Sequence, residues 1–284
     1  MMVISVLFLS GVGLGADASM KDDAFHYMKN GINDQIYNEW WYFNVVSNES
    51  QLFVVYLISD PDNLTLSRKI QVRAVVIEDE KPAATGLHHS RGFGGDLNSP
   101  TFDIDKSGFS SQDDAGLKVW GEVNDHSTNE PIRWDLNYQP AVGPWFAIPV
   151  QAQVGHLKGD WMKWLAYMPS ANVTGTLTLG NRTFDIDGVG YHDHVWGRWA
   201  LNDPKFAWAQ VSIPKDDFSL TIGDILENPQ STYLGIKYGG ETITFSAKQI
   251  KLIYTNFTFD STTARIYPPA TWYWPVAETT NWRR

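Results

Sequence analysis

The chain of 284 residues contains no cysteine, which excludes disulfides, thiolate nucleophiles and cysteine-bound metals. Basic residues are also few, since 22 Lys and Arg stand against 32 Asp and Glu and leave a net charge of −10. A nucleic-acid surface needs a basic stripe, and anionic lipid attracts basic segments. The charge therefore argues against nucleic acid as a partner and against simple adhesion to anionic membranes. No stretch has the periodicity of a long amphipathic helix.

Aromatic residues, in contrast, are abundant, with 13 Trp, 12 Tyr and 14 Phe. A chain of this length with 43% hydrophobic residues can bury the core of one large or two ordinary domains. The aromatic side chains either fill that core or line a roomy apolar cavity. The second possibility predicts a hydrophobic small-molecule ligand. The aromatic runs 161–164 and 272–274 are expected in the core or the pocket wall, and would indicate transient membrane contact if exposed.

The N-terminus resembles a secretory signal. An apolar run from Val3 to Gly13 is followed by Ala16-Asp17-Ala18, which fits a small-residue cleavage site, although no Lys or Arg precedes the run. The run is too short to cross a bilayer, which takes about 20 residues. We expect a signal peptide over residues 1–18 and an extracytoplasmic location for the mature chain.

The rest of the chain is typical of an all-β protein. A hairpin is predicted from 37–46 and 51–58, because two aromatic and β-branched runs flank a polar turn. Further strands are expected at 69–77, 116–123, 132–138, 146–154, 161–168, 173–179 and 183–186. Residues 206–213 and 218–225 repeat the plan of the first hairpin, which indicates a second unit beginning near Trp199. Short strands joined by turns favour antiparallel barrels or sandwiches.

The stretch from Gly188 to Trp199 has the densest packing of reactive and aromatic side chains. Strand alternation places His192, His194 and Trp196 on one face and Tyr191, Asp193 and Val195 on the other. A carboxylate among Val, Tyr and Trp is costly to ionise unless it is paired. Asp193 is therefore either locked to a histidine or arginine, or held protonated as an acid.

Two motifs carry a family resemblance. The run Glu39-Trp40-Trp41-Tyr42-Phe43, together with 190–197 (GYHDHVWG), resembles the carotenoid 1,2-hydratase (hydroxyneurosporene synthase) and AttH-like family, over about residues 33–269. That resemblance implies two tandem lipocalin-like antiparallel β-barrels, here 30–198 and 199–284. It also implies a large apolar pocket near the domain interface and no metal or organic cofactor. The 86 residues from Trp199 to the end are few for an eight-stranded barrel, so an incomplete second barrel is expected.

The available chemistry is acid–base. Hydrating an alkene requires an acid in an apolar pocket, with aromatic faces or carboxylates near the resulting cation. The candidate catalytic residues are Asp193, His194 and Asp224, the last a second carboxylate in an apolar strand. The candidate ligand-binding residues are Trp40, Trp41, Tyr191, His192, Trp196 and Trp199. Glu39 and Arg198 are expected to be structural partners, and the alternative for Asp193 and His194 is a structural pair that pins the domain junction.

Two other kinds of site are weaker interpretations. His192 and His194 form an H-x-H pair that begins some metal sites, but a third ligand is needed, and the adjacent His88 and His89 of a glycine-rich loop would point apart. No metal is therefore expected. The glycine-rich run 91–95 lacks the strand-to-helix context of a phosphate cradle, so nucleotide binding is not expected.

Three functions remain open from the sequence. The first is a cofactor-independent hydratase or cyclase acting on an isoprenoid or other long apolar polyene. The second is an extracytoplasmic lipocalin-like carrier of such a lipid, without catalysis. The third is a β-sandwich that stacks carbohydrate on its aromatic residues. A buried carboxylate bordering a cavity would favour the enzyme, a purely apolar lining the carrier, and an open shallow aromatic groove the carbohydrate binder.

Overall fold

The protein is built from antiparallel strands. The computed structural model describes residues 13–14, 18–28, 36–48, 50–64, 66, 68–79, 81–153, 159–199, 206–225, 232–246, 258–260 and 265–267. The helices in these ranges are short 3-10 turns, at Met20–Asp23, Asp113–Ala115 and Pro214–Asp216. None of the helices in the described ranges is long and apolar enough to cross a membrane. The all-β prediction is confirmed.

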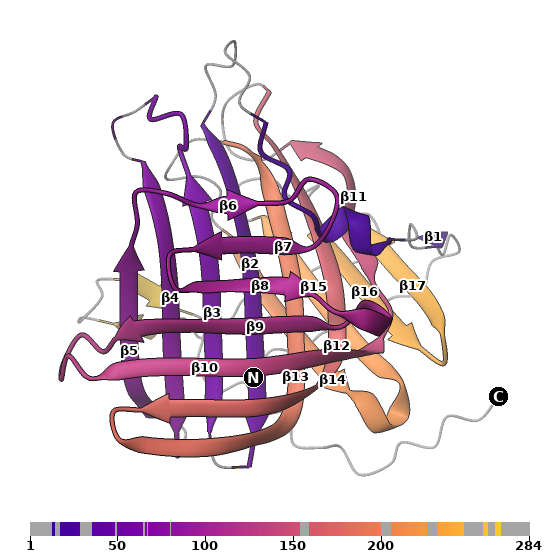
Figure 1. The fold of residues 1–284 in the computed structure, drawn as a ribbon. Coiled ribbons are helices and arrows are strands. Elements are labelled where there is room, and N and C mark those ends of the chain that lie inside the picture. The colour runs from indigo at the N-terminus through magenta and orange to yellow at the C-terminus, as the bar shows by residue number, and fades with distance from the viewer. Residues whose placement is uncertain are drawn as a thin grey trace.

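The strands between Tyr37 and Arg198 form one large antiparallel sheet. Its strands are β2 (Tyr37–Ser47), β3 (Gln51–Ser59), β4 (Lys69–Glu78), β5 (Lys81–His89), β6 (Gly94–Gly95), β7 (Thr101–Ile104), β8 (Ser107–Ser111), β9 (Leu117–Asn124), β10 (Pro131–Val142), β11 (Trp145–Gln153), β12 (Trp161–Leu179) and β13 (Arg182–Arg198). They pair in the order β5-β4-β3-β2-β13-β12-β10-β9-β8-β7-β6, and β11 pairs with β12. The sheet curls until β6 to β10 cross in front of β2 to β5 (Figure 1). One bridge between Gly86 and Asp125 links the two layers, as expected for a lipocalin-like barrel.

A second sheet packs against the outside of the first. It contains β1 (Gly13–Leu14), β14 (Phe206–Ile213), β15 (Phe218–Ile225), β16 (Thr232–Tyr238) and β17 (Glu241–Ser246), in the order β1-β17-β16-β15-β14. A separate pair is formed by β18 (Thr258–Asp260) and β19 (Arg265–Tyr267). The short strand β1 falls inside the segment predicted to be a signal peptide. Closure of the second barrel concerns residues 247–257 and 268–284, which lie outside the described residues, as does the aromatic run 272–274.

Strands β2, β12 and β13 are buried on both faces, which explains why their sequences do not alternate between apolar and polar. Their inner faces join the core of the large sheet, where Trp41, Phe43 and Trp196 lie. Their outer faces join a second cluster that contains Trp164, Tyr191 and Val195. Burial on both faces turns a strand into a nearly continuous apolar run. The site residues are therefore held in a rigid, close-packed layer.

Two glycines allow the second sheet to pack closely against the first. A Cβ at Gly223 of β15 would overlap the ring of Trp164, and a Cβ at Gly235 of β16 would overlap the ring of Trp145. Each tryptophan comes from the large sheet and fills the space that a missing side chain leaves. Glycine is needed here for close approach rather than for an unusual backbone angle.

Several element predictions need correction. His88 and His89 lie in β5 and not in a loop, and the predicted strands 161–168 and 173–179 are parts of the single strand β12. Irregular register near Met168 lets β12 bend while it keeps pairing with β13. A local propensity pattern reads such a bend as a break between strands.

Candidate functional site

The two faces of β13 form two different environments, as alternation along the strand predicted. His192 and His194 point into the core of the large sheet and are fully buried. Asp193, between them, belongs to the opposite face and is 4% exposed. The HDH motif therefore does not form one site. It contributes to two sites on opposite sides of the sheet.

The inner site is a buried network of two histidines and two carboxylates. His192 Nδ1 donates to the Tyr42 carbonyl at 2.9 Å, and its Nε2 lies 2.9 Å from Asp23 Oδ2. His194 Nε2 lies 2.9 Å from Glu39 Oε1, and its Nδ1 lies 3.3 Å from Asp23 Oδ1. All four side chains have 0% exposed area. Buried charges of this kind persist only when they are paired.

Both carboxylate oxygens of Glu39 accept hydrogen bonds. In addition to His194, Glu39 accepts from the Tyr37 hydroxyl at 2.8 Å and from the backbone N–H groups of His26 at 2.8 Å and Tyr27 at 3.2 Å. The backbone donors belong to the segment 18–28, which also supplies Asp23. The network thus fastens this N-terminal segment to strands β2 and β13 of the large sheet.

The electrostatics of this network favour charged partners. Burial opposes ionisation of Asp23, but the charges and hydrogen bonds of His192 and His194 outweigh it and lower the pKa of that carboxyl. Burial would likewise lower the pKa of His194, but the carboxylates of Asp23 and Glu39 raise it. An ionised carboxylate and a protonated imidazole stabilise each other here. This arrangement fits a structural role, in which the buried ion pairs hold Asp23 against the two histidines.

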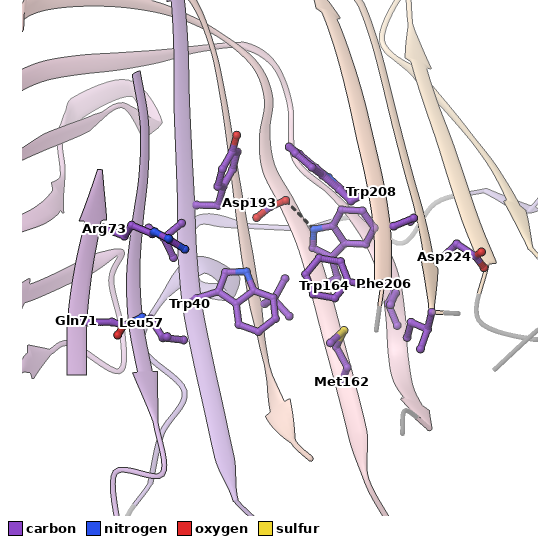
Figure 2. Close-up of a pocket in the computed structure, with 17 residues that line it drawn as sticks. Trp40, Leu57, Gln71, Arg73, Met162, Trp164, Asp193, Phe206, Trp208 and Asp224 are labelled. Atoms are coloured by element: carbon purple, nitrogen blue, oxygen red, sulfur yellow. Dashed lines mark hydrogen bonds between the residues drawn. The ribbon is translucent and has the colours of Figure 1, made fainter. Parts of the chain in front are cut away.

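The outer site is a cavity of about 440 Å³ between the two sheets (Figure 2). Its walls come from β2, β3 and β4, from β11, β12 and β13, and from β14 and β15 of the second sheet. The lining residues are Trp40, Tyr42, Val55, Leu57, Gln71, Arg73, Ile148, Met162, Trp164, Asp193, Val195, Phe206, Ala207, Trp208, Gly223, Asp224 and Ile225. A cavity of this size, with three tryptophans and few polar groups, suits an apolar small molecule.

Asp193 borders this cavity with one oxygen already engaged. Its Oδ2 accepts hydrogen bonds from Trp164 Nε1 at 3.0 Å and from the Tyr191 hydroxyl at 2.8 Å. Figure 2 shows the bond to Trp164. No described residue donates to Oδ1. Two donors on the same oxygen fix the orientation of the carboxyl group and leave the other oxygen to carry the proton.

Burial is the main reason that Asp193 is a weak acid. Removal from water raises its pKa to about 6, although hydrogen bonds from Tyr191 and Trp164 and the charges of the two flanking histidines pull it down. A carboxyl group with this pKa is partly protonated near neutral pH. It is therefore able to donate a proton to a molecule bound in the cavity.

Asp224 is a second carboxylate at the cavity, at the end of β15. It is 9% exposed, and its Oδ1 accepts from the Thr232 hydroxyl at 2.7 Å. Figure 2 shows Asp224 well apart from Asp193, beyond Trp164 and Phe206. The two carboxyl groups thus border different parts of the same cavity.

The structure separates the residues that the sequence grouped as one site. Three candidates line the cavity: Trp40, Asp193 and Asp224. Two others support it from behind, since the Tyr191 hydroxyl bonds to Asp193 and the Trp199 ring packs edge-on against Trp40 at 5.6 Å. The candidates on the opposite, inner face of the sheet are Trp41, His192, His194 and Trp196.

The remaining aromatic and charged candidates belong to the barrel interior or its edge. Trp41 stacks on His194 with ring centroids 4.5 Å apart, and Trp196 stacks on His26 at 4.0 Å. The Arg198 guanidinium lies 5.4 Å from the centroid of the Tyr37 ring. Within the described residues, no group of three His, Asp or Glu side chains is arranged to hold a metal ion.

Sequence reasoning missed three residues that matter for these sites. Asp23 lies in a polar lead-in far from β13 in the sequence, so nothing local indicated that it pairs with the histidines. Trp208 was predicted to lie in a strand but not to face the cavity. Arg73 lines the cavity, and the only sequence signal for this was the alternation of side chains along β4, which places it on that face of the strand.

Comparison with known proteins supports the fold. No family model and no curated protein sequence matches the chain. A candidate AttH protein (NE1406) from Nitrosomonas europaea has a similar structure, with a TM-score of 0.64 and 15% identity over 92% of this chain and 82% of that chain. Kievitone hydratase from Nectria haematococca gives a TM-score of 0.53 and 17% identity, over 81% and 70%. The chain thus has the fold of these proteins, and its tie to carotenoid 1,2-hydratases stays a prediction.

Proposed function

We propose that the protein is a cofactor-independent acid–base catalyst of the hydratase or cyclase type, acting on an isoprenoid or another long, unsaturated apolar molecule in the cavity between the two sheets. The observation that carries the proposal is Asp193, a buried carboxyl group that lines an aromatic cavity and has only one of its two oxygens engaged by described donors. A carrier would need only the apolar lining. The likeness in fold to kievitone hydratase, a hydratase by its name, adds support.

The chemistry requires only the chain and water. The carboxylic acid of Asp193 transfers its proton to one carbon of a double bond, and the π electrons form the new C–H bond. The neighbouring carbon becomes a carbocation, which the faces of Trp40, Trp164 and Trp208 stabilise. Water attacks this carbon and returns one proton to the carboxylate, so that the net change is addition of water and Asp193 is restored.

The same acid also serves a cyclase. A second double bond, in place of water, attacks the cation and closes a ring. The carboxylate then removes a proton from a neighbouring carbon, and the net change is an isomerisation. The amount of water that the bound substrate leaves at the cation would decide between the two outcomes. Asp224, at the far part of the cavity, is a second group that can accept a proton there.

The test is turnover of a panel of acyclic isoprenoids, including geranylgeraniol, squalene and lycopene, in isotopically labelled water. We expect label in an alcohol product or, for cyclisation, a product of unchanged mass and altered retention. Asp193→Asn should lower turnover by roughly 10²- to 10⁴-fold and leave binding intact, because the amide keeps the shape but has no acidic proton.

The matched control is Asp187→Asn, which changes an exposed carboxylate of the same strand outside the cavity and should keep full turnover. Equal turnover by the wild-type protein and Asp193→Asn would refute the acid role. Ligand binding without any turnover, unchanged in both variants, would identify the protein as a carrier.

A further inference from the structure

Two polar side chains interrupt the apolar lining on one side of the cavity. Gln71 and Arg73 both belong to β4 and line the cavity, whereas Val72 between them is buried in the core. They pair across the sheet with Leu57 and Val55 of β3, which also line the cavity. Figure 2 shows Gln71 and Arg73 on the side of the cavity away from the second sheet.

Arg73 is a cation without a carboxylate partner among the described residues. Two other arginines of the large sheet show the contrast, since Arg133 pairs with Glu122 at 2.7 Å and Arg182 with Glu78 at 3.0 Å. A guanidinium stays charged at any ordinary pH and offers several donors in one plane. The planar group that matches it best is a carboxylate.

The charge of this side of the cavity differs from that of the whole protein. The net charge of −10 repels anions in general. Among the described residues that line the cavity, however, Arg73 is the only cation, and the two carboxyl groups, Asp193 and Asp224, come from β13 and β15. A preference for an anionic ligand would therefore have to originate from Arg73.

We propose that the natural ligand is an unsaturated apolar acid, whose carboxylate is held by Arg73 and Gln71 while its chain crosses Trp40 toward Asp193. The inference rests on the proposed function, because it takes the cavity as the substrate site. It narrows the substrate from a pure hydrocarbon to an amphiphile. The anchored end fixes which part of the chain meets the acid, as a remote binding group does in an enzyme.

Binding of the fluorescent polyene cis-parinaric acid and of its methyl ester tests this directly. The two probes share one chain and differ only in the charge of the end group. We expect the wild-type protein to bind the acid about 5-fold more tightly than the ester, a modest preference because Arg73 is exposed and solvent screens its charge. High salt should reduce the preference.

Arg73→Gln should remove the preference for the acid and leave the affinity for the ester unchanged. The matched control is Lys69→Gln, which removes a positive charge from the same strand but outside the cavity lining, and it should keep the preference. Thermal unfolding should be unchanged in both variants, because each alters an exposed side chain.

The outcomes separate the two proposals. Equal binding of acid and ester by the wild-type protein, or the same preference in Arg73→Gln, would overturn the role of Arg73 and leave the cavity as the substrate site. If neither probe binds to the wild-type protein, both the acid-binding inference and the proposed substrate site fail.

Discussion

At the scale of single residues, the position of Asp193 has a consequence for stability. Its pKa is about 6 in the folded state against an ordinary value of 3.8. Between these pH values the folded protein holds more protons than the unfolded chain, so the free energy of unfolding falls as pH rises. The buried carboxyl group therefore costs up to about 3 kcal/mol above pH 6.

Replacing Asp193 by Asn should remove this cost. We expect Asp193→Asn to be at least as stable as the wild-type protein at pH 8, by up to about 3 kcal/mol, and equally stable near pH 4. Urea unfolding at both pH values measures the difference. A loss of several kcal/mol at pH 8 would mean that the charged carboxylate is part of a structural pair.

The hydrogen bond from Tyr191 adjusts the strength of the acid. Because the hydroxyl stabilises the ionised carboxylate, Tyr191→Phe should raise the pKa of Asp193 further above its ordinary value. The pH dependence of the carboxyl infrared band measures the shift. Tyr42→Phe is the control, since its hydroxyl accepts from Asn44. A shift of equal size in both variants would contradict a specific role of the hydrogen bond.

Alternation along one strand was sufficient to predict that Asp193 lies among apolar side chains, on the face opposite to the two histidines. It could not predict their partners. Asp23 and His192 are 169 positions apart in the sequence, and only the fold brings them to 2.9 Å. The sequence grouping of His194 with Asp193 followed proximity along the chain, whereas the pleat separates them.

At the scale of elements, the segment 18–28 is held to the large sheet both by the charges around Asp23 and by the packing of Phe25 in the core. Asp23→Asn should leave two buried histidines without their shared carboxylate and cost about 3 kcal/mol in unfolding free energy. The contribution of Asp23 is lost as pH falls through its lowered pKa, and that of His194 as pH rises through its raised pKa.

The destabilisation by Asp23→Asn should thus be largest between the ordinary pKa values of 3.8 for aspartic acid and 6.5 for histidine, and chemical unfolding across the pH range measures it. The neighbouring Asp22→Asn is a suitable control, because Asp22 only caps the short helix at Ser19 and should cost about 1 kcal/mol or less. Equal effects of the two variants would contradict the role given to Asp23.

Substitution of Gly235 by a larger residue should weaken the packing of the second sheet against the first. Gly235→Ala places a methyl group against the Trp145 ring and should cost about 1–3 kcal/mol by overpacking. Denaturant unfolding and the fluorescence of a dye that binds exposed apolar surface provide the measurement. Gly92→Ala adds the same methyl group where no atom lies within 4 Å and should have no effect.

Strand prediction succeeded where the chain alternates or runs apolar between turns, as in β2, β3 and β4. It failed for β7 and β8, which are only four and five residues long. Those strands exist because neighbours pair with them. The sequence alone also does not indicate that Gly223 and Gly235 make room for tryptophan rings, because a glycine in a strand has several structural explanations.

At the scale of the whole molecule, the proposed function depends on the contact between the two sheets. The large sheet supplies Asp193, the proposed acid, and β14 and β15 supply Trp208, Phe206 and Asp224 on the other side (Figure 2). A pocket made by two sheets depends on how they dock, which no strand pattern records. The family resemblance implied an apolar pocket near a domain interface, and that expectation stays a prediction.

The most direct test of the account is the titration of the Asp193 carboxyl group, followed as the difference between the infrared spectra of the wild-type protein and Asp193→Asn. We predict a protonated carboxyl band that disappears with a pKa of about 6, as expected for a buried acid facing the cavity. A band that titrates near the ordinary value of 3.8 would show a solvated or paired carboxylate and would contradict the proposed proton donor.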